Sequence, residues 1–304
     1  MKVFVVICSV NRPPVLHRTV EALGNQELRA DRVVVSVGKE SDALDATREL
    51  EGVEVYCSPR LGSSSQRNYG LEILSDLDDA VVVFLDDDVV LESRYLLKVK
   101  QLFQASPELM GMSAEVLVNG NVSWEEGISA LQESGVVDQR PAAVRSSGKD
   151  WICHGCNMAF RGSILKVEQF DENLPLYSYA EDYDISIRVA KHGVVGKVDS
   201  GLGAVHLEYR EGRVSEFRRG YSIVANNLYF LRKGVCHIPL WKGYLRFAAV
   251  IVFKESLLDL LAHLRKGAQQ ADYWGRFKGR LAAMGDILLC RSHPKRVLEL
   301  GVHR

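Results

Sequence analysis

The sequence lacks a hydrophobic run long enough to cross a lipid bilayer. The longest apolar stretch in its C-terminal third is FAAVIVF, residues 247–253, and Lys254 and Glu255 end it. A spanning helix needs about 20 apolar residues, so this stretch is excluded as a span. The N-terminal stretch MKVFVVICSVNRPP has neither the length nor the cleavage site of a secretory signal and predicts a first β-strand. We therefore expect a cytoplasmic protein.

A large charge of either sign is also missing. The formal net charge is -1 over 304 residues, so no general field attracts nucleic acid, and we expect no nucleic-acid partner. Any anionic ligand must be held by local groups. With 47% hydrophobic and 25% charged residues, the composition is that of a globular protein. The length suffices for one large domain, alone or with a helical appendage.

Cysteine is too sparse for a disulfide framework or a cysteine zinc site. The chain has six cysteines, and Cys153 and Cys156 in CHGC have the spacing of metal ligands. No second pair completes a tetrahedral site, so zinc is not expected there. Reduced thiols fit the expected cytoplasmic location.

The first 120 residues alternate between apolar β-branched runs and segments with helical periodicity. This alternation predicts an α/β fold with a mostly parallel sheet. Ligands of such sheets bind beyond the carboxyl ends of the strands. The predicted strands are residues 2–9, 32–37, 53–57 and 80–85, and the predicted helices between them are residues 15–23, 43–52 and 65–77.

The second half of the chain is less regular. We expect connecting loops and a short helix over residues 120–150, and mainly helices from Pro239 onward. The predicted domains are 1–235 for the α/β domain and 236–304 for a C-terminal helical subdomain. Further elements are predicted as helices over residues 179–193 and 214–234 and as short strands over residues 194–198 and 203–207.

Three acids follow directly on the fourth predicted strand. Asp86, Asp87 and Asp88 stand in VVVFLDDDVVLE, and like charges so close together repel one another. A divalent cation such as Mg²⁺ or Mn²⁺ would relieve that repulsion, because it prefers carboxylate ligands. Taken alone, the run could equally be a solvated acidic turn.

Two further features bear on this choice. Glu181 and Asp182 open a predicted helix, where acids can either favour the helix dipole or serve as a general base. His206 lies on a short predicted strand. An isolated histidine there can be a satisfied core residue, or it can be a metal ligand beside two carboxylates.

The motifs together resemble the family-two glycosyltransferases of the GT-A fold. The resemblance runs from residue 3 to about residue 233 and rests on six segments in the family's order. They are VVICSVNRPPVLHRTVEAL, RLGSSSQRNYGLE, VVVFLDDDVVLE, CNMAFRGSIL, YAEDYDISIRVAKHG and AVHLEYREGR, with NNLYFLRK after the last.

The resemblance implies inverting transfer of a sugar from a nucleoside-diphosphate donor to a hydroxyl acceptor. It assigns Asp86, Asp88 and His206 to a Mn²⁺ or Mg²⁺ ion, and Asp182, with Glu181, to catalysis. The residues that it implies on the nucleotide-sugar side are Ser9, Asn11, Arg12, Asp42, Arg67, Asn68, Asp86 and Asp87.

The sequence departs from the family pattern after the second strand. Family members often carry an acid there that contacts uracil, but this chain has Ser36 in VSVGKESD, and only Asp42 remains of the pattern. The donor base therefore stays open among uridine, thymidine and guanosine. The acceptor is expected to be a glycan or a lipid-linked glycan, in surface polysaccharide or glycoconjugate synthesis.

Two other functions remain as alternatives. A nucleotidyltransferase would make the sugar nucleotide, but such enzymes usually carry a Gly-rich basic loop at the first strand exit, and CSVNRPP is not one. A binding module without catalysis would have no use for both the acid run and Asp182. Turnover with any sugar nucleotide would decide between a module and an enzyme.

The predicted C-terminal helices mix apolar and basic residues. Two interpretations are open: a helical subdomain packing on the core, or an interfacial helix touching an anionic membrane at its inner face. The basic residues that support the second are Lys242, Arg246, Lys254, Arg265 and Lys266.

Overall fold

The computed structural model divides into two compact units, each described separately. It describes residues 1–134, 144–145, 152–209, 214–266 and 272–300. The sheet unit comprises Met1–Leu61, Ser65–Phe170 and Ile185–Gly212. The helical unit comprises Gly62–Ser64, Asp171–Asp184 and Arg213–Arg304.

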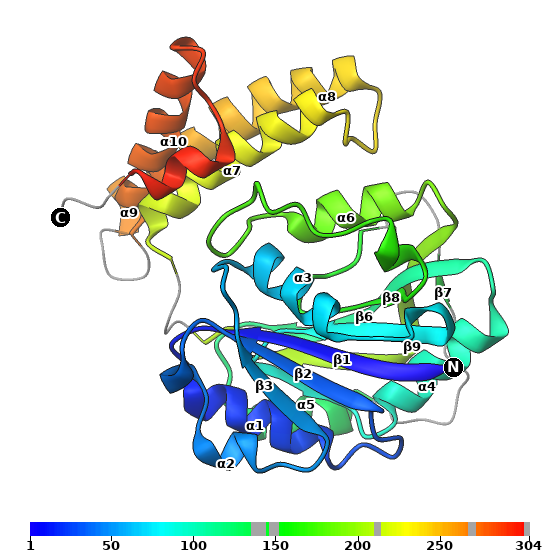
Figure 1. Cartoon of the computed structure of the whole chain (residues 1–304). Helices are drawn as coiled ribbons and strands as arrows, with labels where there is room; N and C mark the ends of the chain where they lie inside the picture. The colour runs from blue at the N-terminus through cyan, green and yellow to red at the C-terminus, as the bar shows by residue number, and fades with distance from the viewer. Residues whose placement is uncertain (135–143, 146–151, 210–213, 267–271, 301–304) are drawn as a thin grey trace. The chain divides into compact units, whose positions relative to one another are not determined.

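The sheet unit is built on one mixed sheet (Figure 1). Its strand order is β3-β2-β1-β4-β8-β6-β9-β5, with β7 paired to β9. The strands are β1 (Lys2–Ser9), β2 (Arg32–Val37), β3 (Val53–Cys57), β4 (Ala80–Leu85), β5 (Val89–Leu91), β6 (Leu109–Asn119), β7 (Val144–Arg145), β8 (Asn157–Arg161) and β9 (Val194–His206).

The first four strands are parallel, so their carboxyl ends share one edge. β1 pairs in parallel with both β2 and β4, and β2 pairs in parallel with β3. β8 runs antiparallel between β4 and β6, and β6 is again parallel to β9. The acid run leaves β4 and the segment SVNR leaves β1, so these two exits are neighbours.

Both faces of the sheet are buried, which explains the uninterrupted β-branched runs. On β1, Val3, Val5 and Ile7 face one core, and Phe4 and Val6 face the other. The first core is covered by α1 (Pro13–Leu23) and α4 (Tyr95–Ala105), and the second by α3 (Ser63–Ile73) and the C-terminal half of α6 (Glu181–Val189). The sheet unit also contains α2 (Asp45–Arg48) and α5 (Trp124–Glu133).

The strand predicted in two pieces is continuous in the structure. Residues 194–198 and 203–207 were expected as separate strands, but β9 runs from Val194 to His206. Its neighbour β6 pairs with both halves, and a register shift between Ala114 and Glu115 absorbs the irregular stretch. Pairing with β6 thus stops after Val198 and resumes at Gly203.

The helical unit contains α7 (Glu216–Lys233) and α10 (Tyr273–Leu288), which pack unusually closely. A Cβ atom on Gly220 of α7 would lie 2.0 Å from the carbonyl oxygen of Arg276, and one on Gly279 of α10 would lie 1.9 Å from that of Phe217. Only glycine permits this approach of two backbones. Between these helices in sequence lie α8 (Leu240–Arg246), a π-helical segment (Phe247–Lys254) and α9 (Glu255–Lys266).

Among the described residues, no helix combines the length and the apolar character that crossing a bilayer requires.

Candidate active site

The acid run lies in a turn between β4 and β5. The amide of Asp86 donates to the carbonyl of Cys156, and Asp87 and Asp88 form the turn. β5 then pairs antiparallel with β9, which puts Val89 opposite His206. This pairing brings a histidine more than 110 positions downstream to the acids.

Asp86, Asp88 and His206 form the one group among the described residues whose donor atoms could hold a metal ion. One ligand atom from each lies within 4.8 Å of the others. His206 Nε2 lies 3.2 Å from Asp88 Oδ1 and 3.8 Å from Asp86 Oδ2. Asp88 Oδ1 is buried, and apart from the His206 ring it has no hydrogen-bond partner. Two carboxylates and one imidazole suit Mn²⁺ or a similar ion, so these residues fit such a group.

Asn119 orients the ring of His206, and this residue was not predicted from the sequence. Its Oδ1 lies 2.7 Å from His206 Nδ1 and accepts the ring proton there. The Nε2 lone pair is then directed at the two carboxylates, as a ligating histidine requires. The two residues are opposite each other in the β6–β9 register, a contact over 87 positions that no local motif announces.

The charges in this group stabilise one another. Burial disfavours the carboxylate of Asp88, yet its hydrogen bond to His206 and the charges of His206 and Arg12 bring its pKa below the usual range. Burial likewise disfavours the imidazolium, but the hydrogen bond to Asp88 and the charges of Asp86 and Asp88 raise the pKa of His206. The two carboxylates thus favour positive charge next to them, which is the charge that a metal cation would supply.

Two arginines offset much of the repulsion in the acid run. Arg12, from the exit of β1, lies 2.6 Å from Asp87 Oδ1 and 3.1 Å from Asp88 Oδ2. Arg67, from α3, lies 3.0 Å from Asp86 Oδ1. Each carboxylate therefore has a cationic partner within the chain.

Asp87, in the middle of the acid run, is fully buried. Burial raises its pKa to about 7, although the charge of Arg12 acts in the opposite direction. Its Oδ2 accepts a hydrogen bond from Ser9 Oγ, and its carbonyl accepts one from Thr19. Asp87 thus fastens the β4 exit to the β1 exit, and it is not a member of the metal-competent group.

The other residues expected on the nucleotide side shape the loops around this edge. Asn11 has a φ of 60° and donates its amide to Asp42 Oδ1 at 3.0 Å. Asp42 is buried, and its Oδ2 accepts the amide of Lys39 at 3.2 Å. The side chain of Asn68 exchanges two hydrogen bonds with the backbone of Phe170.

Glu181 and Asp182 lie in the first turn of α6, in the helical unit. The segment before them has positive φ angles at Leu176, Ser178 and Ala180, all conformations that cost energy for residues other than glycine. Ser178 secures it by donating to the carbonyl of Leu174 at 2.7 Å. Such stored strain is typical of functional loops.

The third acid of this helix has a structural role. Asp184 is fully buried, and its Oδ1 accepts a hydrogen bond from Lys233 Nζ at 2.8 Å. Lys233 also bonds Asp171 Oδ2 at 2.7 Å. This lysine ties α7 to α6 within the helical unit.

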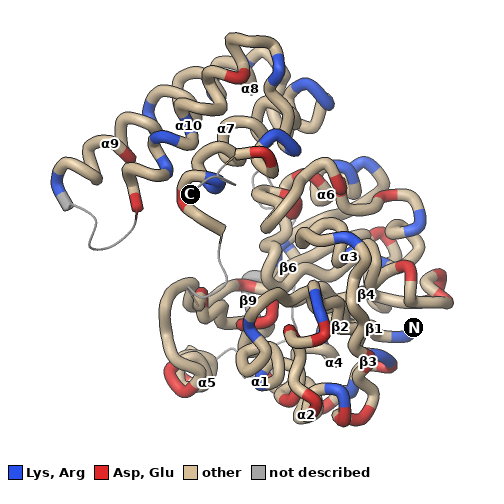
Figure 2. Tube along the Cα trace, turned by 60° about the vertical axis from the view of Figure 1, so that its left-hand side comes forward, with Lys and Arg blue, Asp and Glu red and all other residues tan. Residues whose placement is uncertain are grey.

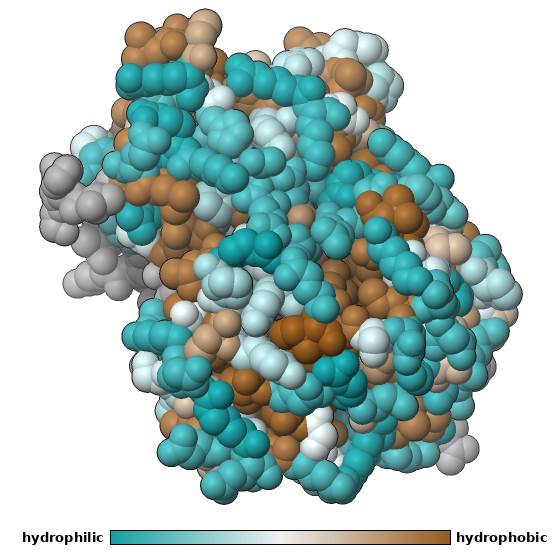
Figure 3. All heavy atoms as spheres, in the orientation of Figure 1, coloured by the Kyte–Doolittle hydropathy of each residue, from teal (hydrophilic) through white to brown (hydrophobic). Residues whose placement is uncertain are grey.

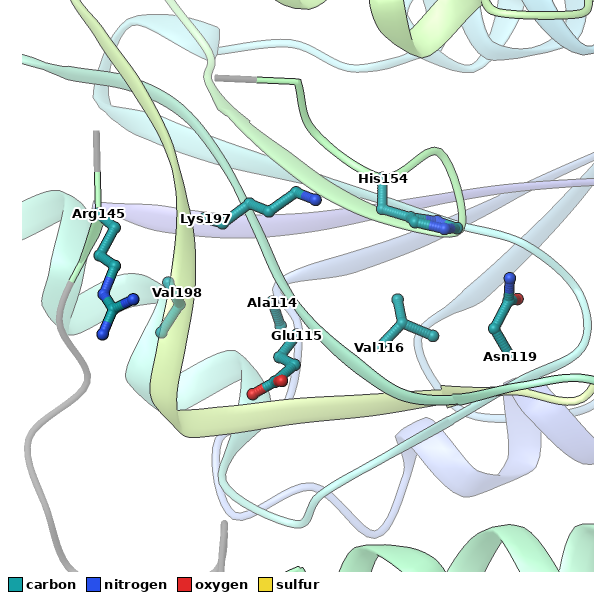
Figure 4. Close-up of a pocket in the computed structure, with 8 residues that line it drawn as sticks. All are labelled: Ala114, Glu115, Val116, Asn119, Arg145, His154, Lys197 and Val198. Atoms are coloured by element: carbon teal, nitrogen blue, oxygen red, sulfur yellow. The ribbon is translucent and has the colours of Figure 1, made fainter. Parts of the chain in front are cut away.

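A cavity of about 400 Å³ adjoins the metal-competent group (Figure 4). Asn119 lines the cavity and also bonds His206. The His154 ring, whose centroid is 6.4 Å from that of His206, and the Lys197 ammonium group lie on the same side of this space. The remaining lining residues are Ala114, Glu115, Val116, Arg145 and Val198.

The chain is similar in sequence to one protein family and in structure to several solved proteins. A sequence model described as glycosyltransferase like family 2 matches residues 2–196. No curated protein matches significantly. The structure is similar to mannosyltransferase PcManGT from Pyrobaculum calidifontis in complex with GDP-Man and Mn²⁺, at 19% identity and a TM-score of 0.55, over 95% of this chain and 80% of that one.

The structure is also similar to S. aureus TarS 1–349. Identity is 15% and the TM-score 0.56, over 99% of this chain and 83% of that one. For the same protein in complex with UDP-GlcNAc, identity is 16% and the TM-score 0.56, over 99% and 84%. At these identities the likeness concerns the fold, and it confirms the predicted GT-A type α/β fold with a mostly parallel sheet and C-terminal helices.

Proposed function

The chain belongs to the glycosyltransferase-like family 2, and from that premise we propose that it transfers a sugar from a nucleoside-diphosphate donor to a hydroxyl acceptor. The observation that carries this proposal is the group formed by Asp86, Asp88 and His206, with Asn119 directing Nε2 toward the carboxylates. A divalent ion, Mn²⁺ or Mg²⁺, would be held by these three ligands. Its chemistry there is to neutralise charge on the leaving diphosphate.

We assign the donor to the edge where β1 and β4 end. Arg12 and Arg67 hold the carboxylates in place there, and Ser9 and Asp87 join the two strand exits. Asn11 and Asp42 shape the neighbouring loop, and Asn68 fixes the segment at Phe170. In this proposal, they act on the nucleotide mainly by positioning the edge that receives it. The base, uridine, thymidine or guanosine, is left to experiment.

The proposed reaction is a single inverting displacement. The acceptor oxygen forms a bond to the anomeric carbon while the bond from that carbon to the diphosphate oxygen breaks, and the electron pair leaves with the diphosphate. Asp182 takes the proton of the acceptor hydroxyl, and Glu181 supports it in the same helical turn. The strained segment before α6 supports this assignment, because it fixes the start of the helix that carries both acids.

The proposed acceptor is a glycan or lipid-linked glycan, used in surface polysaccharide or glycoconjugate synthesis. The cavity beside His206 offers it Lys197, His154 and Asn119 as polar contacts. We further propose cytoplasmic action at the inner face of a membrane, with peripheral contact through the C-terminal helices. A nucleotidyltransferase would instead release pyrophosphate from a nucleoside triphosphate, so product analysis separates the two activities.

The first test is a thermal-shift panel of sugar nucleotides with and without Mn²⁺. A ligand that binds only the folded state raises the melting temperature by mass action. A metal-dependent shift with one nucleotide type supports the proposal and names the base. If neither donors nor nucleoside triphosphates shift the melting temperature, the proposal loses its basis.

The second test addresses the base. Asp182→Asn should lower turnover by about 10²–10⁴-fold, because general-base catalysis contributes that much, while donor binding stays near wild type. Asp45→Asn is the matched control, since Asp45 is an exposed acid in the first turn of α2. An Asp182→Asn variant with full activity would show that the assignment is wrong.

A further inference from the structure

The segment from Leu240 to Lys266 buries two polar side chains and exposes several large apolar ones, while Phe247, Ile251 and Val252 pack against the core of the helical unit. On the inward side Ser256 and Asp259 are 7% and 6% exposed. Asp259 Oδ2 accepts a hydrogen bond from Arg280 Nε at 2.7 Å, and Arg280 is itself 3% exposed. Arg280 also donates to the carbonyl of Ile251, in the π-helical segment, at 2.9 Å. A helix packed in water normally shows the reverse arrangement.

The outward side carries large apolar side chains. Trp241 and Leu245 are each 62% exposed, Phe253 is 71% exposed and Leu264 is 71% exposed. Leu257, 44% exposed, continues the four-residue spacing after Phe253. In Figure 3 hydrophobic residues are exposed over the helix labelled α8 in Figure 1. Apolar surface gathered in this way marks an interaction site.

Basic residues alternate with this apolar stripe. Lys242, Arg246, Lys254 and Arg265 are all exposed, and Figure 2 shows blue segments recurring along α8 and α9. The stretch has two acids, and both are near Arg280: the buried Asp259 lies 2.7 Å from it, and Glu255, whose side chain is 41% exposed, lies 3.8 Å from it. The side chain of Lys266 lies outside the described residues.

We propose that residues 240–265 form a docking surface for an anionic lipid bilayer, with the apolar stripe in the headgroup and acyl boundary and the four cations at the phosphates. This proposal rests on the membrane contact proposed above and is independent of the donor, metal and base assignments. The combination of a basic surface with Trp, Phe and Leu is what interfacial helices use. Trp241 and Tyr244 at one end fit the preference of these rings for the headgroup level.

A second copy of the chain is the competing occupant, and the charges disfavour it. In a two-fold dimer the same patch meets itself, so Lys242, Arg246 and Lys254 would approach their own copies. No exposed acid lies between residues 240 and 265 outside the Arg280 pairs to offset that repulsion. An anionic bilayer supplies both the apolar phase and the opposite charge.

The test is co-sedimentation of the full chain with vesicles, without donor or acceptor. We expect binding to phosphatidylcholine vesicles that contain about one third phosphatidylglycerol, and little binding to phosphatidylcholine alone. Trp241→Ser/Phe253→Ser should weaken binding at least about tenfold. Lys242→Gln/Arg246→Gln should weaken it about fivefold per charge on the anionic vesicles only.

The matched control is Ile128→Ser/Val167→Ser. These residues are 39% and 70% exposed in the sheet unit and should leave vesicle binding unchanged. Circular dichroism of each variant checks that it is folded. No binding of the wild type to anionic vesicles, or full binding by Trp241→Ser/Phe253→Ser, would overturn the proposal.

Light scattering tests the competing occupant. A dimer that Trp241→Ser/Phe253→Ser converts to monomer would assign the surface to a second copy and likewise overturn the proposal. Vesicle binding by a protein that transfers no sugar would leave the docking surface standing while removing the proposed function. Sugar transfer without vesicle binding would do the opposite.

Discussion

The sheet unit and the segment 240–266 differ in where they place charged and large apolar side chains. In the sheet, valines, isoleucines and phenylalanines fill both faces, and the charged groups gather where strands end. In the segment, Asp259 and Ser256 turn inward while Phe253 and Leu264 turn outward. The first arrangement places the charged side chains at the edge of the sheet where the parallel strands end. In the second, Arg280 and Arg276 hold the inward Asp259, and Phe247, Ile251 and Val252 pack against the core of the helical unit.

The two regions also differ in how far their charged side chains are exposed to solvent. In the acid run of the sheet unit, the side chain of Asp86 is 31% exposed, so solvent reaches it, whereas Asp87 and Asp88 are buried. Among the described residues of the helical unit, the Arg280–Asp259 pair is closed off, and burial raises the pKa of Asp259 against the charge of Arg280. A buried ion pair stabilises the fold, whereas a charged group that solvent reaches can also bind a ligand.

The largest stability effect should come from the buried ion pair of the sheet unit. Lys98 Nζ lies 2.7 Å from Glu92 Oε1, and both side chains are almost completely buried. Lys98→Met should lower the free energy of unfolding by about 3–5 kcal/mol, because it leaves a buried carboxylate unpaired. Urea denaturation measures this. Arg29→Met, from a pair with exposed side chains, should change stability by less than about 1 kcal/mol and serves as the control.

The corresponding change in the helical unit is Arg280→Met. It removes the partner of Asp259 and a donor to the Ile251 carbonyl. We expect a loss of about 3 kcal/mol, at the lower end for a broken buried pair, because Arg276 remains near Asp259. Denaturation followed by helical circular dichroism would detect it. A neutral result would mean that the inward polar network does not hold the segment.

A smaller effect is expected on metal binding at the sheet edge. Asn119→Ala frees the His206 ring from its hydrogen bond and should weaken Mn²⁺ binding about 10–100-fold, as loss of a supporting partner does elsewhere. Titration calorimetry would measure the affinity. Asn25→Ala is the control, since Asn25 is exposed in the same unit. Unchanged affinity would contradict the orienting role.

The smallest effect on stability is expected from substituting an exposed ring of the segment 240–266. Phe253→Ser should alter the free energy of unfolding by no more than about 0.5 kcal/mol, because the ring is 71% exposed. Phe103→Ser, in the sheet core at 1% exposure, should cost about 3–5 kcal/mol. If Phe253→Ser destabilised the protein as strongly, its ring would be packed within the fold, and the outward stripe would not be available to a bilayer.

The first four strands could be predicted to the residue because their signal is local. β1, β2 and β4 are runs rich in β-branched residues and mostly buried, and β3 is a half-buried strand at the end of the sheet; all four have the predicted bounds. The Asn119–His206 bond and the Arg12–Asp87 pair had no such signal, because strand pairing creates them between distant positions. The placing of the acid run at a strand exit was foreseeable; its arginine partners were not.

The C-terminal segment shows another limit. Apolar spacing indicated helices there, and the structure has them. Periodicity tells which residues share a helix face, but not whether that face turns inward. That choice depends on Arg280, an ion-pair partner that lies 21 positions after Asp259. The roles of the site residues stay predictions until they are tested.

The pairing of Arg12 with Asp87 and Asp88 has a consequence for anyone who engineers this chain. The exits of β1 and β4 form one electrostatic unit, so substitutions in the two loops will not have additive effects. A library that varies position 12 alone would sample mostly chains with an uncompensated, buried carboxylate. A library aimed at the proposed donor site should therefore vary both loops together. Arg12, Asp87 and Asp88 should be either all kept or all replaced.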